Sequence, residues 1–209
     1  MTPKKQQPLF ITFEGIDGCG KSTQAMMVFQ LLKSKGYRVN LLREPGSTAV
    51  SEKIRDILLD KKSKISDVTE LLLYEAARSE ITFREIIPAL NKGTIVLCDR
   101  FYDSTTAYQG FGRKLDIRMV KSLHKIAAHN IVPDLTFIFD VDLDTAYARR
   151  GKKKDRLESQ SRAFFQRVRA GFMEIARKER RRVKRIDAAQ PIEKVFDDVK
   201  MYLSKKLLI

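Results

Sequence analysis

The amino-acid sequence predicts an α/β fold in which a five-stranded parallel sheet is flanked by helices. Five short segments are predicted as strands, at residues 9–13, 38–43, 94–98, 135–139 and 183–186, and those at 9–13, 94–98 and 135–139 are mostly apolar. Segments of helical length and pattern lie between them, an alternation typical of parallel strands joined by crossover helices. With 209 residues, 43% of them hydrophobic, the chain suits one domain with a sizeable core.

The segment after the first predicted strand has the pattern of a phosphate-binding loop. Residues 15–22 read GIDGCGKS and match G-x-x-x-x-G-K-[ST], and helix-forming sequence follows. Glycines let phosphate oxygens approach backbone N–H groups, while the new helix points its positive end at the same anion. Lys21 adds a charge near the β and γ phosphates, and the Ser22 hydroxyl can ligate Mg²⁺. We therefore predict a P-loop NTPase fold that binds a nucleoside triphosphate. The residues expected to contact it are Gly15, Ile16, Asp17, Gly18, Cys19, Gly20, Lys21, Ser22 and Thr23.

The third predicted strand ends in a carboxylate. Four apolar residues precede Asp99, and an aspartate at the end of a buried strand is the Walker B arrangement for Mg²⁺. Arg100 follows directly and is expected to bind an anion of its own. Residues 101–112 (FYDSTTAYQGFG) combine hydroxyls, an amide and aromatic rings, which indicates recognition of a small molecule.

Residues 44–48 (EPGST) have the composition of a turn that leaves the second strand. Loops at the carboxyl ends of strands line ligand crevices in open α/β sheets. Arg43, Glu44 and Arg55 are therefore placed to meet an anion or its metal, with a purely structural turn as the alternative.

A long amphipathic helix is predicted from residue 67 to about residue 91. Asp67 and Glu70 fit a capping box that opens this helix. Tyr74 and Arg78 are four residues apart and share one face, either as a ring and a cation that meet a ligand or as a surface pair. The inner face is expected to carry Leu71, Leu72, Ala76 and Ala77.

The other helices are predicted from their apolar spacing and end signals. The first is expected to end near Lys35, because Gly36 is a natural residue after a helix end. Later helices are expected over residues 116–129, over a segment that ends near residue 182, and over residues 192–208.

Two histidines, His124 and His129, lie in the helix predicted over residues 116–129. Neither has a cysteine or a second histidine at metal-ligand spacing. We expect both to be solvated on the surface.

Positive charge is concentrated in the last third of the chain. The net charge is +15, and residues 149–209 hold 20 Lys and Arg against 8 Asp and Glu. A nucleic acid could explain this surplus, and so could a small polyanionic substrate together with a solvated basic helix. The cations at 149–158 surround a glycine, which favours a mobile loop over a regular helix.

The ends and the cysteines indicate a protein of the reducing cytoplasm. Residues 1–8 lack the apolar segment of a signal peptide and are expected to form a flexible arm, and no run is long enough to span a membrane. Cys19 and Cys98 form neither a disulfide framework nor a metal-ligand pattern.

Five motifs in the same order together resemble those of the thymidylate kinase family of nucleoside monophosphate kinases. They are FEGIDGCGKSTQ, REPG, the Tyr74-x-x-x-Arg78 pair, CDRFYDSTTAYQG, and DRLE followed by FFQRVR. The likeness runs from about residue 9 to residue 203. It implies a single P-loop kinase domain at 9–209 with a lid at about 149–158, a homodimer, and transfer of the γ-phosphoryl group of ATP to dTMP with Mg²⁺, giving dTDP and ADP.

The resemblance also implies roles for residues of the acceptor site. Asp17 would bind the 3′-hydroxyl, and Tyr74, where many relatives have Phe, would stack on thymine. Arg78 would hydrogen-bond a carbonyl of the base. Arg100 would hold the 5′-phosphate, helped by Arg43 or Arg55. The full set implied for dTMP is Asp17, Glu44, Arg55, Tyr74, Arg78, Arg100, Ser104, Thr105 and Tyr108, with Tyr108 crowding out a ribose 2′-hydroxyl.

The donor site and the catalytic cations are implied in the same way. Arg150 would lie against adenine, near residues 188–190, and Ser22 and Asp99 would hold the metal. One group of the family carries a catalytic Arg in the phosphate loop, where this chain has Gly18, and in the other group the lid supplies the cation. The implied catalytic residues are therefore Lys21 and Arg100 with the lid candidates Lys152, Lys153, Lys154 and Arg156.

Two other functions are compatible with parts of the pattern. The nearer is a kinase for another nucleoside or deoxynucleoside monophosphate. The more distant is a P-loop ATPase stimulated by nucleic acid, for which the basic third would be the footprint. The chain shows no recognised nucleic-acid module, so ATP and dTMP are the expected partners, without nucleic acid or membrane.

Overall fold

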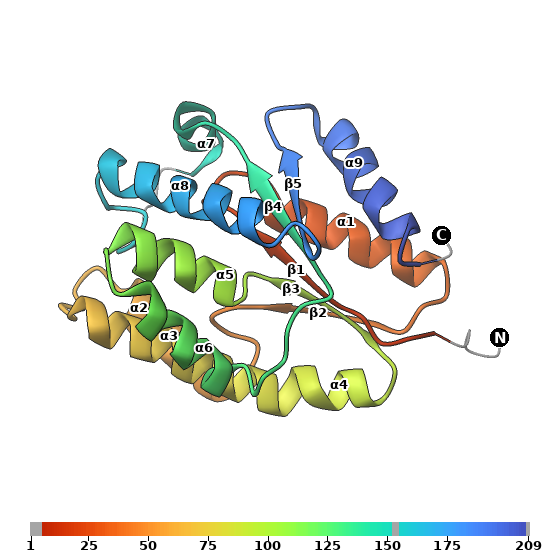
Figure 1. The fold of residues 1–209 in the computed structure, drawn as a ribbon, viewed down its shortest axis with the longest axis horizontal. Coiled ribbons are helices and arrows are strands. Elements are labelled where there is room, and N and C mark those ends of the chain that lie inside the picture. The colour runs from red at the N-terminus through yellow and green to blue at the C-terminus, as the bar shows by residue number, and fades with distance from the viewer. Residues whose placement is uncertain (1–5, 152–154, 208–209) are drawn as a thin grey trace.

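Five parallel strands form one central sheet, as predicted (Figure 1). The computed structural model describes residues 6–151 and 155–207. The sheet has the order β2-β3-β1-β4-β5, so β2 and β5 are its edges. The strands are β1 (Phe10–Glu14), β2 (Val39–Arg43), β3 (Ile95–Asp99), β4 (Leu135–Asp140) and β5 (Val183–Asp187).

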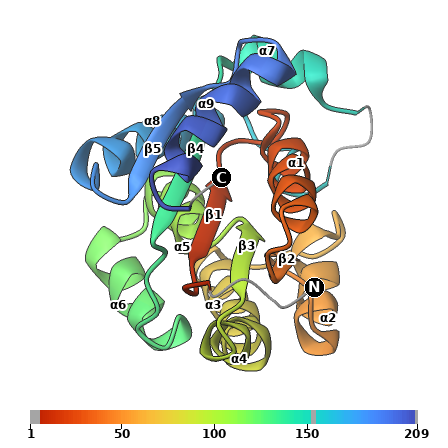
Figure 2. The ribbon, with the colours of Figure 1, turned by 90° about the vertical axis from the view of Figure 1, so that its right-hand side faces the viewer.

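Helices cover both faces of the sheet (Figure 2). Helices α1 and α9 lie against one face, and α4 and α8 against the other. The helical elements are α1 (Lys21–Ser34), α2 (Ala49–Leu59), α3 (Asp67–Ile81), the π-helical turn η1 (Thr82–Ile86), α4 (Ile87–Asn91), α5 (Tyr102–Thr105), the π-helical segment η2 (Thr106–Gly112), α6 (Ile117–Ala127), α7 (Leu143–Arg149), α8 (Arg162–Lys178) and α9 (Ile192–Ser204).

The two sides of the core follow the alternation of side chains along the strands. In β3, Ile95 and Leu97 belong to the cluster that includes the inner face of α1. Val96 and Cys98 belong to the cluster on the opposite side, with Ile86 of η1. Successive side chains of a strand point to opposite faces, so a fully apolar strand is buried on both.

The strand register brings several loops to one edge of the sheet. Asp99 of β3 lies opposite Phe13 of β1 and Arg43 of β2. The three strands therefore end together, and the segments that follow them begin side by side. This edge carries the phosphate loop, the turn at 44–48 and the segment after Asp99, which is where ligands bind in open α/β sheets.

Helix α3 differs from its prediction at its start and on its buried face. Its N-cap is Ser66, whose hydroxyl accepts from the Thr69 N–H, so Asp67 and Glu70 do not form a capping box. Leu72 is 50% exposed and Ala76 is exposed, while Leu71 and Ala77 are buried as expected. The reason is that α3 packs between α2 and α6 with charged residues inside, namely Glu70, Glu75 and Arg78.

Helix α8 ends at Lys178, four residues earlier than predicted. Beyond it, Arg182 turns inward and donates two hydrogen bonds to Asp103, at 2.7 and 2.9 Å. A further bond from Arg182 reaches the Thr136 hydroxyl at 2.8 Å. This buried bidentate pair connects the start of β5 with α5.

The predicted N-terminal arm and the cysteines can be checked in part. Gln6 donates to the carbonyls of Arg38 and Gly93 and accepts from the Arg38 N–H, so the described end of the arm is anchored. Cys19 and Cys98 are buried free thiols, as expected. Among residues 6–151 and 155–207, no helix combines the length and the apolar character that a membrane span needs.

Asp103→Asn is expected to lower the free energy of unfolding by about 2 kcal/mol, because it removes the buried carboxylate that binds Arg182 and leaves that guanidinium with only the more exposed Glu179 as an ionic partner. Urea denaturation measures this loss. The matched control is Asp144→Asn, which breaks a bidentate pair with Arg162 that is exposed on both sides. Solvent screens that pair, so we expect no measurable change. Equal losses in the two variants would contradict the structural role of the Asp103–Arg182 pair.

Candidate active site

The phosphate loop lies between β1 and α1 and has the predicted backbone shape. Gly15, Gly18 and Gly20 all have positive φ angles, of 140°, 86° and 90°. A Cβ on Gly18 would lie 2.2 Å from the carbonyl oxygen of Ala146 in α7. Position 18 therefore has no room for a side chain, and an arginine there is sterically excluded.

A cavity of about 540 Å³ opens beside this loop. It is lined by residues 18–24 on one side and by the segment after β5 on the other. Arg149 lines the cavity and donates to the carbonyl of Ala188 at 2.7 Å. Arg150, predicted to lie against adenine, has its guanidinium carbon 4.3 Å from the ring centre of Tyr147 and is not among the residues that line this cavity. The two adjacent arginines have no distinguishing sequence signal, and sequence analysis missed Arg149.

The predicted metal ligands meet at the base of the loop. The Ser22 hydroxyl hydrogen-bonds Oδ2 of Asp99. The other oxygen, Oδ1 of Asp99, is buried and has no hydrogen-bond partner among the described residues. A buried carboxylate oxygen that lacks a partner, next to a hydroxyl, fits the oxygen donors that Mg²⁺ prefers.

Asp17 connects the phosphate loop with the neighbouring site. Its Oδ1 accepts from the Lys21 ammonium at 3.2 Å and from the Arg100 guanidinium, and its Oδ2 accepts from the Tyr108 hydroxyl at 3.1 Å. Burial opposes ionisation of this carboxyl, but Arg100 and Lys21 outweigh it and lower the pKa of Asp17. The pair of cations expected to hold two phosphates thus shares one carboxylate.

Arg100 is held in a fixed direction. Its backbone has a φ of 74°, in the left-handed region that non-glycine residues rarely adopt. Its Nη1 donates to the carbonyl of Gly15 at 2.9 Å and to the Ser104 hydroxyl at 3.0 Å. These contacts aim the guanidinium across the end of the phosphate loop.

A small second cavity, of about 80 Å³, lies on the far side of Asp17 and Arg100. It collects nearly all the residues that the resemblance implied for the acceptor. Those that line it are Asp17, Glu44, Arg55, Tyr74, Arg100, Ser104, Thr105 and Tyr108, together with the unpredicted Pro45, Leu59, Gln109, Asp155 and Leu157.

Arg78, the remaining predicted acceptor residue, lies behind the wall of this cavity. It is 1% exposed, so it is not half of a surface pair with Tyr74. Each nitrogen of its guanidinium makes a 2.9 Å bond, Nε to Glu44, Nη1 to Glu75 and Nη2 to Thr105. Burial disfavours the positive charge of Arg78. The negative charges of Glu44 and Glu75 outweigh this effect and raise the pKa of Arg78.

The two arginines proposed as helpers of Arg100 differ in position. Arg55 lines the acceptor cavity and donates to the Pro45 carbonyl at 2.9 Å. Arg43 instead makes a half-exposed ion pair with Glu52 at 2.9 Å. Only Arg55 of this pair therefore faces the cavity.

The predicted lid cations fall into two groups. Lys152, Lys153 and Lys154 lie outside the described residues. Arg156 donates to Glu70 at 2.7 Å and to the Leu58 carbonyl at 2.8 Å. Glu70 is buried and also binds Arg113 and Gln109. In this arrangement Arg156 anchors the end of the segment predicted as a lid to α2 and α3.

The prediction of a solvated His124 is wrong. His124 is 7% exposed, because it occupies the inner face of α6 between Val120 and Ala127. Its ring nitrogens contact Glu75 and Thr106, both at 2.8 Å. His124 follows Val120 by four residues and precedes Ala127 by three, which places all three on one helix face. This spacing was the sequence signal for its burial. His129 is exposed, as predicted.

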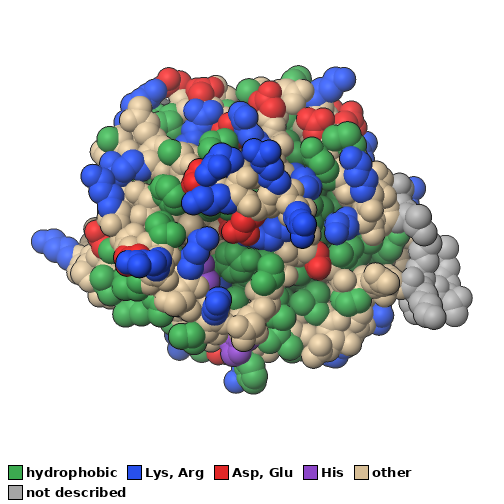
Figure 3. Space-filling model, in the orientation of Figure 1, with side chains coloured by type: hydrophobic (Ala, Val, Ile, Leu, Met, Phe, Trp, Pro, Cys, Tyr) green, Lys and Arg blue, Asp and Glu red, His purple; other side chains and the backbone are tan. Residues whose placement is uncertain are grey.

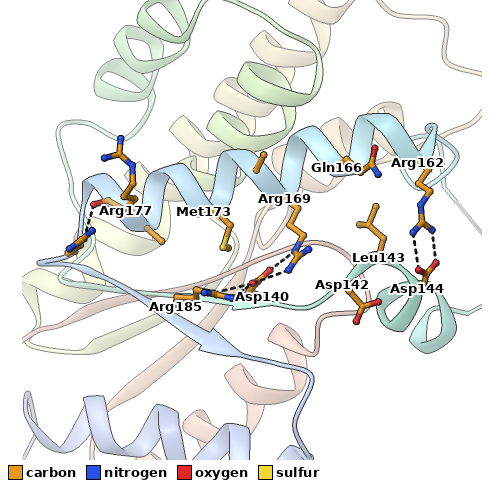
Figure 4. Close-up of a pocket in the computed structure, with 13 residues that line it drawn as sticks. Asp140, Asp142, Leu143, Asp144, Arg162, Gln166, Arg169, Met173, Arg177 and Arg185 are labelled. Atoms are coloured by element: carbon orange, nitrogen blue, oxygen red, sulfur yellow. Dashed lines mark hydrogen bonds and ion pairs between the residues drawn. The ribbon is translucent and has the colours of Figure 1, made fainter.

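The surplus of positive charge is visible over α8 and β5, where basic and acidic side chains are mixed (Figure 3). A cleft of about 850 Å³ lies there. Arg169 from α8 and Arg185 from β5 both reach Asp140, at 2.6 and 2.7 Å (Figure 4). Arg162 is paired with Asp144. Much of this charge is therefore engaged in ion pairs within the chain.

Glu14, which sequence analysis missed, supports the acceptor site from below. It accepts from the Phe101 N–H at 2.7 Å and from the Ser104 hydroxyl at 2.5 Å. Burial, together with the nearby Asp103, raises its pKa to about 8. Its signal in the sequence is a lone carboxylate directly after the apolar residues 9–13.

A P-loop, a Walker B aspartate and an adjoining second cavity on a parallel sheet define a P-loop kinase of the nucleoside monophosphate kinase type. Comparison with known proteins identifies the family within this class. A family model described as thymidylate kinase matches residues 13–199. The chain therefore belongs to the thymidylate kinase family, whose members are phosphotransferases. The more distant alternative, an ATPase stimulated by nucleic acid, has no support from these matches.

Individual relatives agree with the family model. The chain is 47% identical over 191 residues to thymidylate kinase of Thermoanaerobacter pseudethanolicus, covering 91% of this chain and 94% of the relative. It is 48% identical over 191 residues to thymidylate kinase of Prosthecochloris aestuarii, covering 86% of each. The crystal structure of thymidylate kinase from Ehrlichia chaffeensis superposes with a TM-score of 0.79 at 37% identity, covering 95% of this chain and 99% of that one.

Glu14→Gln is expected to gain stability relative to the parent as the pH rises. The folded-state pKa of Glu14 is about 8 and its ordinary value is 4.5, so between these values the folded chain holds a proton that the unfolded chain has lost. Raising the pH therefore destabilises the parent, by about 1 kcal/mol per pH unit, while glutamine does not titrate. Urea denaturation at several pH values measures the difference. A difference that is constant between pH 6 and 8 would contradict a raised Glu14 pKa.

Proposed function

We propose that the chain transfers the γ-phosphoryl group of ATP to dTMP, giving dTDP and ADP. The observation that carries this proposal is the shared carboxylate of Asp17. It places Lys21 of the phosphate loop and Arg100 of the acceptor cavity within one ion cluster. Two phosphates bound by these cations would meet end to end, which is the alignment that phosphoryl transfer requires.

The donor would lie in the cavity beside the phosphate loop. The loop amides and Lys21 would hold the β and γ phosphates, and Arg149 and Arg150 would border the adenine, close to residues 188–190. Ser22 and Asp99 would hold Mg²⁺, which when bound neutralises charge on the transferred group. The acceptor phosphate is already an anion, so the reaction needs no general base.

The acceptor would lie in the second cavity. Arg100, with Arg55, would bind the 5′-phosphate, and Asp17 would bind the 3′-hydroxyl. Tyr74 would stack on the base. Arg78 lies behind the wall that includes Ser104 and Thr105, where its Nη2 bonds Thr105. On binding, the same nitrogen would turn to a base carbonyl while Glu44 and Glu75 hold the other two nitrogens. Tyr108 would exclude a ribose 2′-hydroxyl.

The lid would supply the remaining catalytic charge. Position 18 in the phosphate loop has no room for a cation, so we assign that charge to Lys152, Lys153 or Lys154. Arg156, the fourth candidate, would anchor the closing segment through Glu70. Lid closure would also exclude water from the transferred group and limit hydrolysis.

We also propose that two copies associate and that the enzyme works in the cytoplasm. Two free, buried thiols suit a reducing compartment. Helix α3 lies between α2 and α6, and these three helices carry exposed apolar side chains that a second copy could cover. They are Val50, Ile57, Val68, Leu72, Met119 and Ile126. Light scattering that gives the mass of a single chain would contradict the dimer.

A coupled assay of ADP release across the nucleoside monophosphates tests the proposed function. We expect dTMP to be the best acceptor. The acceptor dUMP lacks only a methyl group, which is worth about 1 kcal/mol in a close-fitting pocket, so it should react several-fold less efficiently. Complete rejection of dUMP, or a better rate with a purine monophosphate, would contradict the proposed acceptor.

Lys21→Ala serves as the control for this assay. It removes the charge expected at the transferred phosphate, and we expect turnover to fall by about 100-fold or more. Circular dichroism should show an intact fold, because the loop shape depends on glycines. Turnover near that of the parent would remove the phosphate loop from the reaction.

A further inference from the structure

His124 belongs to a closed ring of polar contacts that also includes Arg78. Its Nδ1 lies 2.8 Å from Oε1 of Glu75, and the same oxygen accepts from Arg78 at 2.9 Å. Its Nε2 lies 2.8 Å from the hydroxyl of Thr106. The neighbouring Thr105 closes the ring by accepting from Arg78 at 2.9 Å. These contacts join α3, α6, the end of α5 and the start of η2.

The chemistry of the ring determines where the His124 proton lies. Arg78 and His124 outweigh burial and lower the pKa of Glu75, so Glu75 is an ionised carboxylate that only accepts hydrogen bonds. Nδ1 of His124 must therefore be the donor. Burial lowers the pKa of His124, so its imidazole is neutral. The Nε2 atom of this imidazole therefore accepts a hydrogen bond from the Thr106 hydroxyl.

The shared oxygen of Glu75 makes Arg78 depend on His124. The other oxygen, Oε2, is buried and has no hydrogen-bond partner among the described residues. Without the donor on α6, the carboxylate is free to rotate and offer both oxygens to Arg78. The guanidinium would then follow Glu75 and move relative to Thr105, which lines the acceptor cavity.

We propose that His124 is a positioning residue for recognition of the acceptor base, acting through Glu75 on Arg78. This inference rests on the proposed function, in which Arg78 meets a carbonyl of the dTMP base. It assigns a role to a side chain that touches neither substrate. It also predicts an effect on dTMP that leaves ATP unaffected.

Two conservative substitutions separate the two hydrogen bonds of His124. An asparagine amide nitrogen can take the place of Nδ1, whereas a glutamine amide takes the place of Nε2. His124→Asn therefore keeps the hydrogen bond to Glu75 and loses the one to Thr106. His124→Gln keeps the hydrogen bond to Thr106 and loses the one to Glu75. We expect His124→Gln to raise KM for dTMP about tenfold, the cost of a hydrogen bond to a charged group, with kcat and KM for ATP unchanged. His124→Asn should stay close to the parent in all three constants.

His129→Gln is the matched control, because it makes the same change at an exposed histidine two residues beyond α6. We expect it to match the parent enzyme. Equal values of KM for dTMP in His124→Gln and His124→Asn would overturn the inference. So would a parallel rise of KM for both substrates, which indicates general damage to the fold.

Glu75→Gln keeps the test open if His124→Gln does not fold. It removes the charge of Glu75, which lies between His124 and Arg78, and so weakens the same connection. We expect it to raise KM for dTMP and to leave KM for ATP unchanged. If both variants fold, the double variant should show no further rise, because both changes break one connection. Additive effects would overturn the inference. Failure of the parent to phosphorylate dTMP is a separate result, which would overturn the proposed function and this inference with it.

Discussion

One carboxylate, that of Asp17, makes the arrangement of this site possible. Lys21 and Arg100 come from different loops and carry like charges, yet they lie together in a largely buried position. Asp17 accepts from both and also from Tyr108, so it offsets their repulsion and fixes their distance. The cavity beside the phosphate loop and the second cavity open on either side of this cluster. Under the proposed function, each phosphate would take the place of Asp17 as a partner of one cation, with little rearrangement of the protein.

Helix α3 is the scaffold of the acceptor side. Its buried face carries Glu70, Glu75 and Arg78 in place of a continuous apolar stripe. Each of these charges is paired: Glu70 binds Arg156, and Arg78 binds both Glu75 and Glu44 of the turn after β2. Buried pairs of this kind contribute little net stability. Their effect here is to fix directions, because the guanidinium of Arg78 is bonded at all three nitrogens and the imidazole of His124 at both.

The strands, the phosphate loop and the Asp99 position could be predicted from the sequence because each depends on local order. An apolar run followed by a glycine-rich turn and a lysine has few alternative structures. The polar side of α3 could not be predicted in this way. Glu75 and His124 are 49 residues apart, and no local pattern pairs them. Arg149 and Arg150 are equivalent in sequence, and only the direction of the chain at the end of α7 decides which one lines the cavity.

The closed space around Gly18 has a consequence for substitutions in the phosphate loop. The carbonyl oxygen of Ala146 lies 2.2 Å from the place of a Cβ at position 18. Any side chain there would force α7 to withdraw, and the φ of 86° at this position adds strain for every residue other than glycine. A cation therefore cannot be introduced at position 18 by one mutation while the main chain of α7 keeps its present path.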